Sequence, residues 1–425
     1  MSIIDYFLCV KEISDLRRNQ YRKRDDLLNI QERNLRIILD HAFHNVQLYN
    51  SKFKLKGIRP NEIKKIEDLT KISMITKQEI KNGMQKNPRY VLDRNSNLNK
   101  CRISHTAGTT GMPLKIYKSK KDLYYNWARQ SFVFFECGVK LRDKIIRILD
   151  TTIKKVYWFQ KFGALRIEDI SIKQPIHDII NKLSKSKFDA LQSYPTIYSL
   201  LTQHIENCKI NPRIIFSAAE TLSEKVRREI NSVFNTELFE LYGAHEFGRI
   251  AFECDQHCGM HAISDHYIIE VLRDGEHVSP GEKGEIVITG LHNYTMPFIR
   301  YRIGDVGMLS DEVCGCGRNY PLIKGFEGRI DDFLELPSGR IISPRNVNNL
   351  EYTEGVAEFQ IIQKRRDKFL VKLVKGNGFS KNTISEIKEI IKSGCLGEEV
   401  NVEVKVVDRI ERGKTGKLKN VISNV

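Results

Sequence analysis

Between residues 144 and 243, short apolar runs alternate with longer amphipathic segments, and this alternation restricts the possible folds of the chain most strongly. The expected strands lie at residues 145–149, 190–194, 213–218 and 237–243, and the expected helices at residues 176–183 and 222–234. Strands that alternate with helices build mostly parallel sheets covered by helices. Small or polar residues stand near the strand ends, namely Ser193, Ser217 and Gly243. Such sheets bind ligands at the carboxyl ends of their strands, so a site is expected there.

The regions on either side have other patterns. Before residue 100 the pattern is helical, and one helix face carries the apolar residues Leu35, Ile38, Leu39, Ala42 and Val46. After residue 265, strands and tight turns predict a β-rich subdomain. The end of the chain predicts a small α+β unit, with strands at residues 358–365, 368–376 and 401–410 and a helix at residues 380–393. The predicted fold class is α/β, with parallel sheets in an N-terminal body of residues 1–330 and a C-terminal domain of residues 331–425.

The chain is basic, which raises the question of nucleic-acid binding. It has 425 residues, with 69 Lys and Arg against 53 Asp and Glu and a formal net charge of +16. Acidic residues are interleaved with the basic ones, and no helix-turn-helix or aromatic–basic pattern occurs. A Lys-rich solvated surface explains most of the charge, and attraction of a polyanionic small molecule such as a nucleotide is the next explanation. Nucleic acid is therefore not an expected partner.

Neither membrane insertion nor secretion is expected. No run of about 18 apolar residues is available for a transmembrane helix, and the N-terminus lacks the features of a secretory signal. A cytoplasmic location is predicted, and its reducing conditions keep cysteines as free thiols or metal ligands. The sequence is compatible with a homodimer.

Four of the nine cysteines occur in two short segments that predict a metal site. The first segment, ECDQHCGMH, contains Cys254 and Cys258, and the second, CGC, contains Cys314 and Cys316. The most economical tetrahedral set is Cys254, His261, Cys314 and Cys316, with Cys258 as the alternative to His261. Thiolates in a full set of protein ligands favour a structural zinc ion. Reduced free cysteines are the competing interpretation.

The most informative motif is SHTAGTTGMP at residues 104–113. Its two glycines flank two threonines, so backbone N–H groups and hydroxyls can surround phosphate oxygens. It is not the loop of P-loop NTPases, because no Gly-Lys-Ser/Thr follows at the required spacing. A turn of this kind is common by itself, and its significance depends on the motifs downstream.

Those motifs follow in a characteristic order: SAAETLSE at residues 217–224, ELYGAHEFG at 240–248, MPFIRYRIGD at 296–305, GRIDD at 328–332 and TGK at 415–417. From about residue 30 onward the chain resembles the phenylacetate–CoA ligase-like branch of the adenylate-forming (acyl-CoA synthetase) superfamily, which includes relatives associated with capsular polysaccharide biosynthesis. The resemblance implies that ATP activates a carboxylic acid, aromatic or small, to an acyl-adenylate, and that the acyl group passes to coenzyme A. The alternatives are adenylyl or acyl transfer to a polysaccharide precursor, a carrier thiol or a deazaflavin hydroxyl, and a non-catalytic nucleotide-binding scaffold.

The resemblance implies a nucleotide-binding role for each matching residue. The ATP phosphates would be held by Thr106, Gly108, Thr109, Thr110 and Gly111. The adenine would lie against Ala219, Glu220, Tyr242 and Gly243. The ribose hydroxyls would bind Asp305, supported by Arg329.

It also implies how the reaction is catalysed. Glu246 matches the magnesium-binding carboxylate, and Lys417 matches the lysine that reaches the reacting carboxylate and phosphate oxygens. Attack of a carboxylate on the α-phosphate brings two anions together, so the positive charges of magnesium and lysine offset their repulsion. In the family the C-terminal domain is mobile and rotates after adenylation, which places the hinge at Asp331.

Three positions depart from the family pattern. Ala107 replaces a hydroxyl residue in the phosphate loop, and Met112 stands where many relatives have lysine. His245 precedes Glu246 in place of a small hydroxyl residue, and a histidine there can still donate to the AMP phosphate. These changes leave ATP binding expected, but they bear on the rate and on the acyl acceptor.

Overall fold

The computed structural model describes residues 3–105, 114–149, 160, 163–204, 210–220, 222, 224–327, 334–342, 346–347, 350, 353–376, 378–411 and 420–425. Most of the described strands belong to one 12-stranded mixed sheet. In order across the sheet they are β11 (Glu276–His277), β10 (Tyr267–Arg273), β12 (Gly284–Gly290), β13 (Tyr301–Ser310), β14 (Leu322–Glu327), β9 (Met260–Ala262), β8 (Gly248–Glu253), β7 (Glu237–Ala244), β6 (Ile214–Ala218), β5 (Ala190–Ser193), β3 (Lys144–Leu149) and β4 (Arg166–Ser171).

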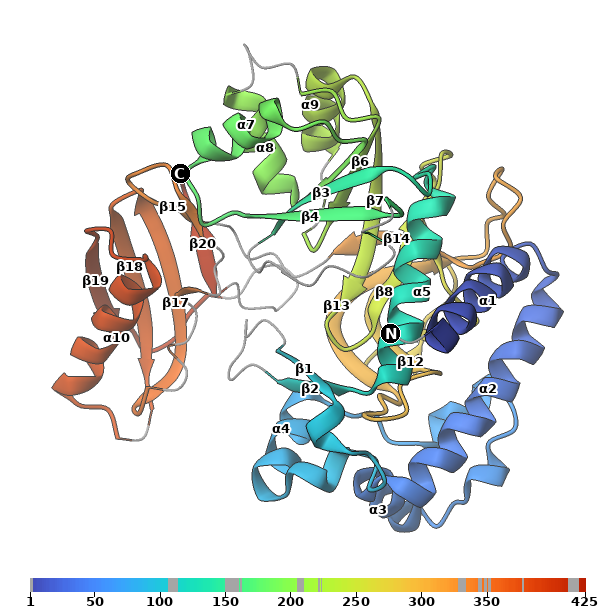
Figure 1. The fold of residues 1–425 in the computed structure, drawn as a ribbon. Helices are drawn as coiled ribbons and strands as arrows, with labels where there is room; N and C mark the ends of the chain where they lie inside the picture. The colour runs from blue at the N-terminus through green and yellow to red at the C-terminus, as the bar shows by residue number, and fades with distance from the viewer. Residues whose placement is uncertain are drawn as a thin grey trace.

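The half of the sheet from β4 to β7 is parallel and has helices on both faces. Helices α7 (Ile176–Lys185), α8 (Pro195–His204) and α9 (Glu224–Phe234) lie together on one side (Figure 1). Their apolar residues share a core with Ile146, Leu191 and Ile215. The alternate residue Phe216 points to the other face, where its ring lies 5.1 Å from that of Phe134 in α5 (Lys120–Glu136). This is the predicted α/β arrangement, and the four predicted strands and two predicted helices of this region are confirmed.

Two elements of this half were not predicted. β4 carries charged residues in an otherwise apolar pattern, and one of them, Asp169, accepts hydrogen bonds from Arg147 on β3 at 2.7 and 2.9 Å. A strand at the edge of a sheet tolerates such residues, which hides it from a search for apolar runs. α8 begins at Pro195, directly after the predicted strand, without an intervening linker to mark it.

The other half of the sheet is antiparallel and curls back toward the parallel half. Strands β14, β9 and β8 lie between β13 and β7 in the sheet order. Even so, the hydroxyl of Tyr301 on β13 reaches Glu246, and the hydroxyl of Tyr242 on β7 reaches Asp305 on β13. Contacts across such a separation require strong bending of the sheet. The β-rich subdomain predicted after residue 265 is confirmed in β10 to β13.

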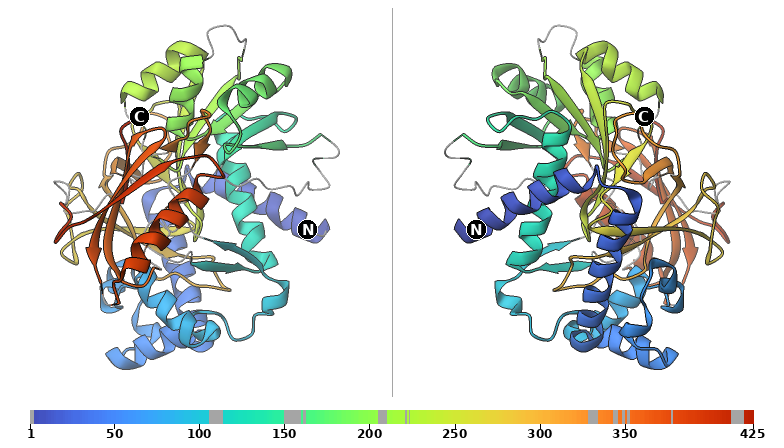
Figure 2. Two further views of the ribbon diagram at one scale, coloured as in Figure 1. Left: turned by 90° about the vertical axis from the view of Figure 1, so that its left-hand side faces the viewer. Right: turned by 90° about the vertical axis from the view of Figure 1, so that its right-hand side faces the viewer.

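Helices precede the sheet, as the pattern of the first hundred residues predicts. They are α1 (Ile3–Asn19), α2 (Arg24–Asn45), α3 (Gln47–Lys56) and α4 (Lys77–Lys86), with the short 3₁₀ helices η1 (Pro60–Glu62), η2 (Ile66–Lys71), η3 (Pro88–Val91) and η4 (Leu98–Lys100). All five residues of the predicted apolar face, Leu35 to Val46, are at most 1% exposed. α1 packs across α5, as both views from the sides show (Figures 1 and 2). Among the described residues, no helix combines the length and apolar composition needed to cross a membrane.

The C-terminal unit has its own sheet and its own apolar core. Its sheet order is β19 (Asn401–Val406), β18 (Lys368–Lys375), β17 (Val356–Arg365) and β20 (Val421–Ser423), and α10 (Lys381–Gly394) lies along one face (Figure 2). A two-stranded sheet of β15 (Leu334–Glu335) and β16 (Ile341–Ile342) precedes it. The predicted strand pair, helix and further strand are confirmed. The domain boundary after residue 330 stays a prediction, and the hinge residue Asp331 lies outside the described residues.

Candidate active site

The turn between β7 and β8, residues 245–247, is the centre of the candidate site. Gly243 and Gly248 flank it, and both are required by the close approach of the two strands. A Cβ on Gly243 would lie 2.6 Å from the backbone oxygen of Gly248. Gly248 itself has φ of +79°, and a Cβ there would lie 1.7 Å from Asn126 Oδ1. The glycines of the YGAHEFG motif therefore have a steric role in holding this turn against α5.

Side chains from other elements hold all three backbone carbonyls of this turn. Lys118 Nζ donates to the His245 carbonyl at 2.7 Å, and Asn293 Nδ2 donates to the Glu246 carbonyl at 3.0 Å. The Phe247 carbonyl accepts from both Arg129 Nη2 at 2.8 Å and the Tyr267 hydroxyl at 2.6 Å. Hydrogen bonds from charged donors are among the stronger ones in proteins. The turn is therefore fixed from several directions before any substrate binds.

Glu246 is the carboxylate of this turn, and its side chain is buried, with the residue 4% exposed. Its Oε1 accepts a hydrogen bond from the Tyr301 hydroxyl at 3.0 Å. A buried carboxylate is costly without a partner for its charge. The position and charge of Glu246 fit a magnesium ligand, since magnesium binds through one or two carboxylates together with substrate phosphates.

Asp305 and Tyr242, predicted at the ribose and the adenine, lie together. The Tyr242 hydroxyl donates to Asp305 Oδ2 at 2.9 Å, and both residues are buried. The Tyr242 ring also lies 4.4 Å from that of Phe326. Two motifs more than 50 residues apart in the sequence thus meet through Tyr242–Asp305 and Tyr301–Glu246.

The ends of the parallel strands carry polar groups that need a partner. Ala219, directly after β6, has a φ of +71°, a strained value that occurs at binding sites more often than elsewhere. Gln192 lies near the end of β5 and Ser217 near the end of β6. Their buried atoms Gln192 Oε1 and Ser217 Oγ have no hydrogen-bond partner among the described residues. The same holds for Ser104 Oγ, at the start of the phosphate-loop motif. Buried polar atoms nearly always have partners, so this edge fits a polar ligand.

Two paired strands flank the predicted phosphate-loop motif in the sequence. β1 (Arg102–His105) and β2 (Lys115–Lys118) pair in antiparallel fashion on either side of it. Lys118 joins this strand pair to the β7–β8 turn through the His245 carbonyl, and burial lowers the pKa of Lys118 to about 8. Lys118 was not singled out from the sequence, although a lysine in the strand after a phosphate loop is a signal that could have been used.

Several predicted residues lie outside the described residues. They are the phosphate-loop residues Thr106, Gly108, Thr109, Thr110 and Gly111, the departures Ala107 and Met112, and Arg329, Asp331 and Lys417. Their roles stay predictions.

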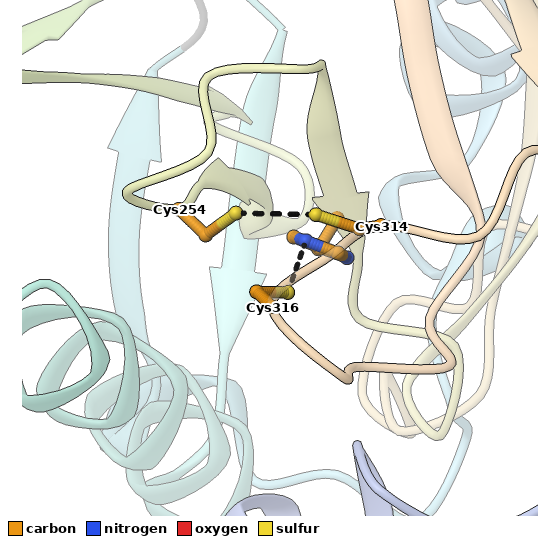
Figure 3. A group of neighbouring side chains, drawn as sticks. Cys254, Cys314 and Cys316 are labelled. Carbon is orange, nitrogen blue, oxygen red and sulfur yellow. Dashed lines mark hydrogen bonds between the residues drawn. The ribbon is translucent and has the colours of Figure 1, made fainter.

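The predicted metal ligands form one cluster. The ligand atoms of Cys254, His261, Cys314 and Cys316 all lie within 4.8 Å of one another. Cys254 Sγ lies 3.5 Å from Cys314 Sγ, and Cys316 Sγ lies 3.3 Å from His261 Nε2. Figure 3 shows the three cysteines gathered together. Two thiolates on one tetrahedral zinc ion, each about 2.3 Å from it, lie about 3.8 Å apart. The set that was predicted as most economical therefore fits a tetrahedral ion.

The surroundings of His261 favour metal binding through Nε2. Its Nδ1 lies 3.4 Å from the backbone oxygen of Tyr320, to which it can donate, leaving the Nε2 lone pair for a metal. Burial lowers the pKa of His261 to about 4, so the ring is neutral. The alternative ligand Cys258 lies 3.2 Å from Cys314 Sγ and completes the surroundings of the cluster. His257 lies outside it, paired with Glu253 and Glu237.

Known proteins are similar to this chain in sequence and in fold. Residues 334–424 match the family model of the CapK C-terminal domain. The chain is 23% identical to Protein CapK of Staphylococcus aureus over 95% of this chain and 91% of that protein. It is 26% identical to the phenylacetate-coenzyme A ligase of Escherichia coli K12, over 79% of this chain and 77% of that enzyme.

Among solved structures, a 2-hydroxyisobutyryl-CoA ligase in complex with 2-HIB-AMP and CoA, in the thioesterification state, is similar. Its TM-score is 0.72 at 19% identity, over 96% of this chain and 91% of that one. The predicted fold class is thereby confirmed. The chain has the fold of the adenylate-forming CoA ligases and is related to their phenylacetate–CoA ligase-like branch and to CapK, as its motifs indicate.

Proposed function

We propose that this protein is an AMP-forming carboxylate–CoA ligase. A carboxylate oxygen of the acid attacks the α-phosphorus of ATP, and pyrophosphate leaves. The thiol of CoA then attacks the acyl carbon, and AMP leaves with the electron pair of the broken C–O bond. Relatives named phenylacetate-coenzyme A ligase support this enzyme class, and ATP, CoA and a carboxylic acid are the substrates that the class requires.

One observation carries the proposal: the curled sheet joins the motif expected to bind magnesium to the motif expected to bind the ribose. The hydrogen bonds Tyr301–Glu246 and Tyr242–Asp305 tie the β7–β8 turn to β13 at the edge where the parallel strands end. Asp305 in its ionised form is an acceptor for the two ribose hydroxyls. Glu246 would hold magnesium, which offsets the phosphate charge as the carboxylate approaches.

We propose in addition that the four-residue cluster binds a structural zinc ion. The ligand atoms fit a tetrahedral ion, and four protein ligands leave no open coordination position for catalysis. The cluster joins the loop after β8 to the segment before β14, and these strands lead to the β7–β8 turn and to β13 respectively. Zinc would thus stabilise the curl that brings the two motifs together.

A second candidate function is transfer of the acyl group to an acceptor other than CoA. It is kept because the chain is also similar, over 95% of its length, to Protein CapK, whose name specifies no acceptor. In the family that the motifs resemble, the C-terminal domain rotates after adenylation and presents a different face for thioester formation. The preference for an aromatic or small acid and the cytoplasmic location stay predictions, the latter supported by the expected use of ATP and CoA. A homodimer also stays a prediction.

The test is acid-dependent release of pyrophosphate from Mg-ATP across a panel of carboxylic acids, with and without CoA. The proposed function predicts release with one class of acid and formation of its CoA thioester. Release that does not depend on CoA, with no thioester formed, would favour the second candidate. No release with any acid would contradict both and favour a nucleotide-binding scaffold.

Replacing Lys417 with alanine is expected to lower the rate of adenylation by about 10²–10³ while ATP still binds, because one cation is lost from the reacting oxygens. The measurement is acid-dependent ATP–pyrophosphate exchange beside equilibrium binding of ATP. Lys414→Ala, in the same segment, is the matched control and should keep its rate. An unchanged exchange rate in Lys417→Ala would remove Lys417 from this role.

A further inference from the structure

The N-terminal helix α1 contributes a carboxylate to a buried chain of polar contacts that ends at the β7–β8 turn. α1 contains none of the motifs that carry the family resemblance, the first of which begins at residue 104. Glu12 projects from α1 toward His266, which directly precedes β10. His266 is 1% exposed and the side chain of Glu12 is 18% exposed, so the contact is largely buried.

The chain of contacts has short distances throughout. Glu12 Oε1 lies 2.6 Å from His266 Nε2, and the Tyr124 hydroxyl donates to the other oxygen of Glu12 at 3.3 Å. His266 Nδ1 lies 2.8 Å from Arg129 Nη1. Arg129 Nη2 donates to the backbone oxygen of Phe247 at 2.8 Å. Phe247 is the residue directly after Glu246, so the chain ends at the backbone of the expected magnesium-binding turn.

Hydrogen-bonding rules fix the protons in this chain. An arginine side chain only donates, so His266 Nδ1 must accept and carries no proton. The ring N–H is then on Nε2 and donates to the Glu12 carboxylate. Burial and the neighbouring Arg129 lower the pKa of His266 well below its usual value, which agrees with a neutral ring. Each group in the chain thus has one available orientation.

A second observation indicates that orientation matters here. Arg129 is 3% exposed and is the only charged donor on the third carbonyl of the turn among the described residues. Its guanidinium contacts the His266 imidazole and the Phe247 carbonyl and also lies 5.2 Å from the centre of the Tyr267 ring. A buried guanidinium depends on such partners for its position. The His266 ring is in turn packed 4.3 Å from the ring of His292, which limits its rotation.

We propose that Glu12 is a positioning residue of the active site, which acts through His266 and Arg129 to hold the turn that carries Glu246. The inference rests on the proposed function for the role of Glu246 in binding magnesium. The contact chain itself does not depend on that role. Without the carboxylate, His266 loses the acceptor of its N–H and Arg129 loses a fixed partner, so the Phe247 carbonyl is less restrained.

Replacing Glu12 with alanine is expected to lower kcat for ATP–pyrophosphate exchange by about 10- to 10²-fold, since small displacements of a catalytic group have effects of this size. The magnesium concentration needed for half-maximal rate should rise, while KM for the acid stays unchanged. Glu12→Gln keeps an oxygen acceptor for His266 and should restore most of the rate. Asp15→Ala is the matched control, because Asp15 lies on the same helix and pairs with Arg18 at the surface.

An NMR measurement and a second variant distinguish a positioning role of Glu12 from a loss of folding. In ¹⁵N NMR of the wild-type protein, His266 Nδ1 should give the signal of an unprotonated nitrogen, and Glu12→Ala should shift the Nε2–H signal, because the hydrogen bond from Nε2–H to the carboxylate is lost. If Glu12→Ala does not fold, Arg129→Lys replaces it, since lysine cannot contact both His266 and the Phe247 carbonyl. A wild-type rate and magnesium dependence in the folded variant, or a protonated Nδ1 in the wild type, would overturn the proposal. If the wild type shows no exchange with any acid, the proposed function fails, and the tautomer together with magnesium-dependent binding of ATP still decides the role of Glu12.

Discussion

Replacing Glu246 with glutamine is expected to lower the rate of acid-dependent ATP–pyrophosphate exchange by about 10²–10³, the usual effect of removing one charge-stabilising group at a reacting centre. Glutamine has nearly the same volume and keeps an oxygen acceptor for the Tyr301 hydroxyl, which now lies 3.0 Å from Oε1. The substitution therefore removes the negative charge and leaves the packing of the turn. Thermal unfolding measured beside the exchange rate should give a Tm close to that of the wild type.

The control for this substitution is Glu276→Gln, which removes the same charge from an exposed position on β11. It should leave both rate and Tm unchanged. In Glu246→Gln, raising the magnesium concentration should recover part of the rate if the carboxylate binds the ion. An exchange rate equal to that of the wild type at low magnesium would exclude Glu246 from the site.

Replacing Cys314 with serine is expected to abolish zinc binding and to lower the stability of the protein by several kcal/mol. Cys314 is the central ligand of the cluster, since its Sγ lies 3.5 Å from that of Cys254 and 3.2 Å from that of Cys258. Structural zinc contributes directly to the free energy of folding. A loss of about 1 kcal/mol lowers Tm by roughly 2–4 °C in domains of 150–250 residues, so a drop of many degrees should be measurable.

Cys101→Ser provides the matched control, because Cys101 lies outside the cluster and is a free cysteine. It should keep one zinc ion per chain in elemental analysis and a Tm close to the wild-type value. Chelation of the wild-type protein should lower its Tm toward that of Cys314→Ser and should not affect that variant. Gently purified wild-type protein without zinc would contradict the structural-site proposal.

Local patterns predicted most of the elements but not the curl of the sheet. The parallel strands and the C-terminal strand pair were found because apolar runs and turn residues bound them. β4 was missed because its charged residues, such as Asp169, are satisfied by a neighbouring strand rather than by solvent. The curl depends on contacts such as Tyr301–Glu246, between residues 55 positions apart, and no local pattern reports such a contact.

The candidate site was predicted through motifs, and its supporting residues were not. Glu246, Tyr242 and Asp305 stand in recognisable motifs, and the structure brings them together. Arg129 and Lys118 hold backbone carbonyls, a task that many donors can perform and that leaves no fixed spacing in the sequence. The Cys–His cluster was predictable because few residue types bind zinc and its members fall in two short segments of the sequence.

The central claim is that a carboxylate oxygen attacks the α-phosphate of ATP, and oxygen transfer tests it most directly. The acid that releases pyrophosphate is labelled with ¹⁸O in its carboxylate, and the AMP formed in the presence of CoA is analysed by mass spectrometry. Adenylation predicts one ¹⁸O atom in AMP, because the bridging oxygen stays on phosphorus when the acyl carbon is attacked by the thiol. AMP without ¹⁸O, or formation of ADP with the label in phosphate, would contradict it.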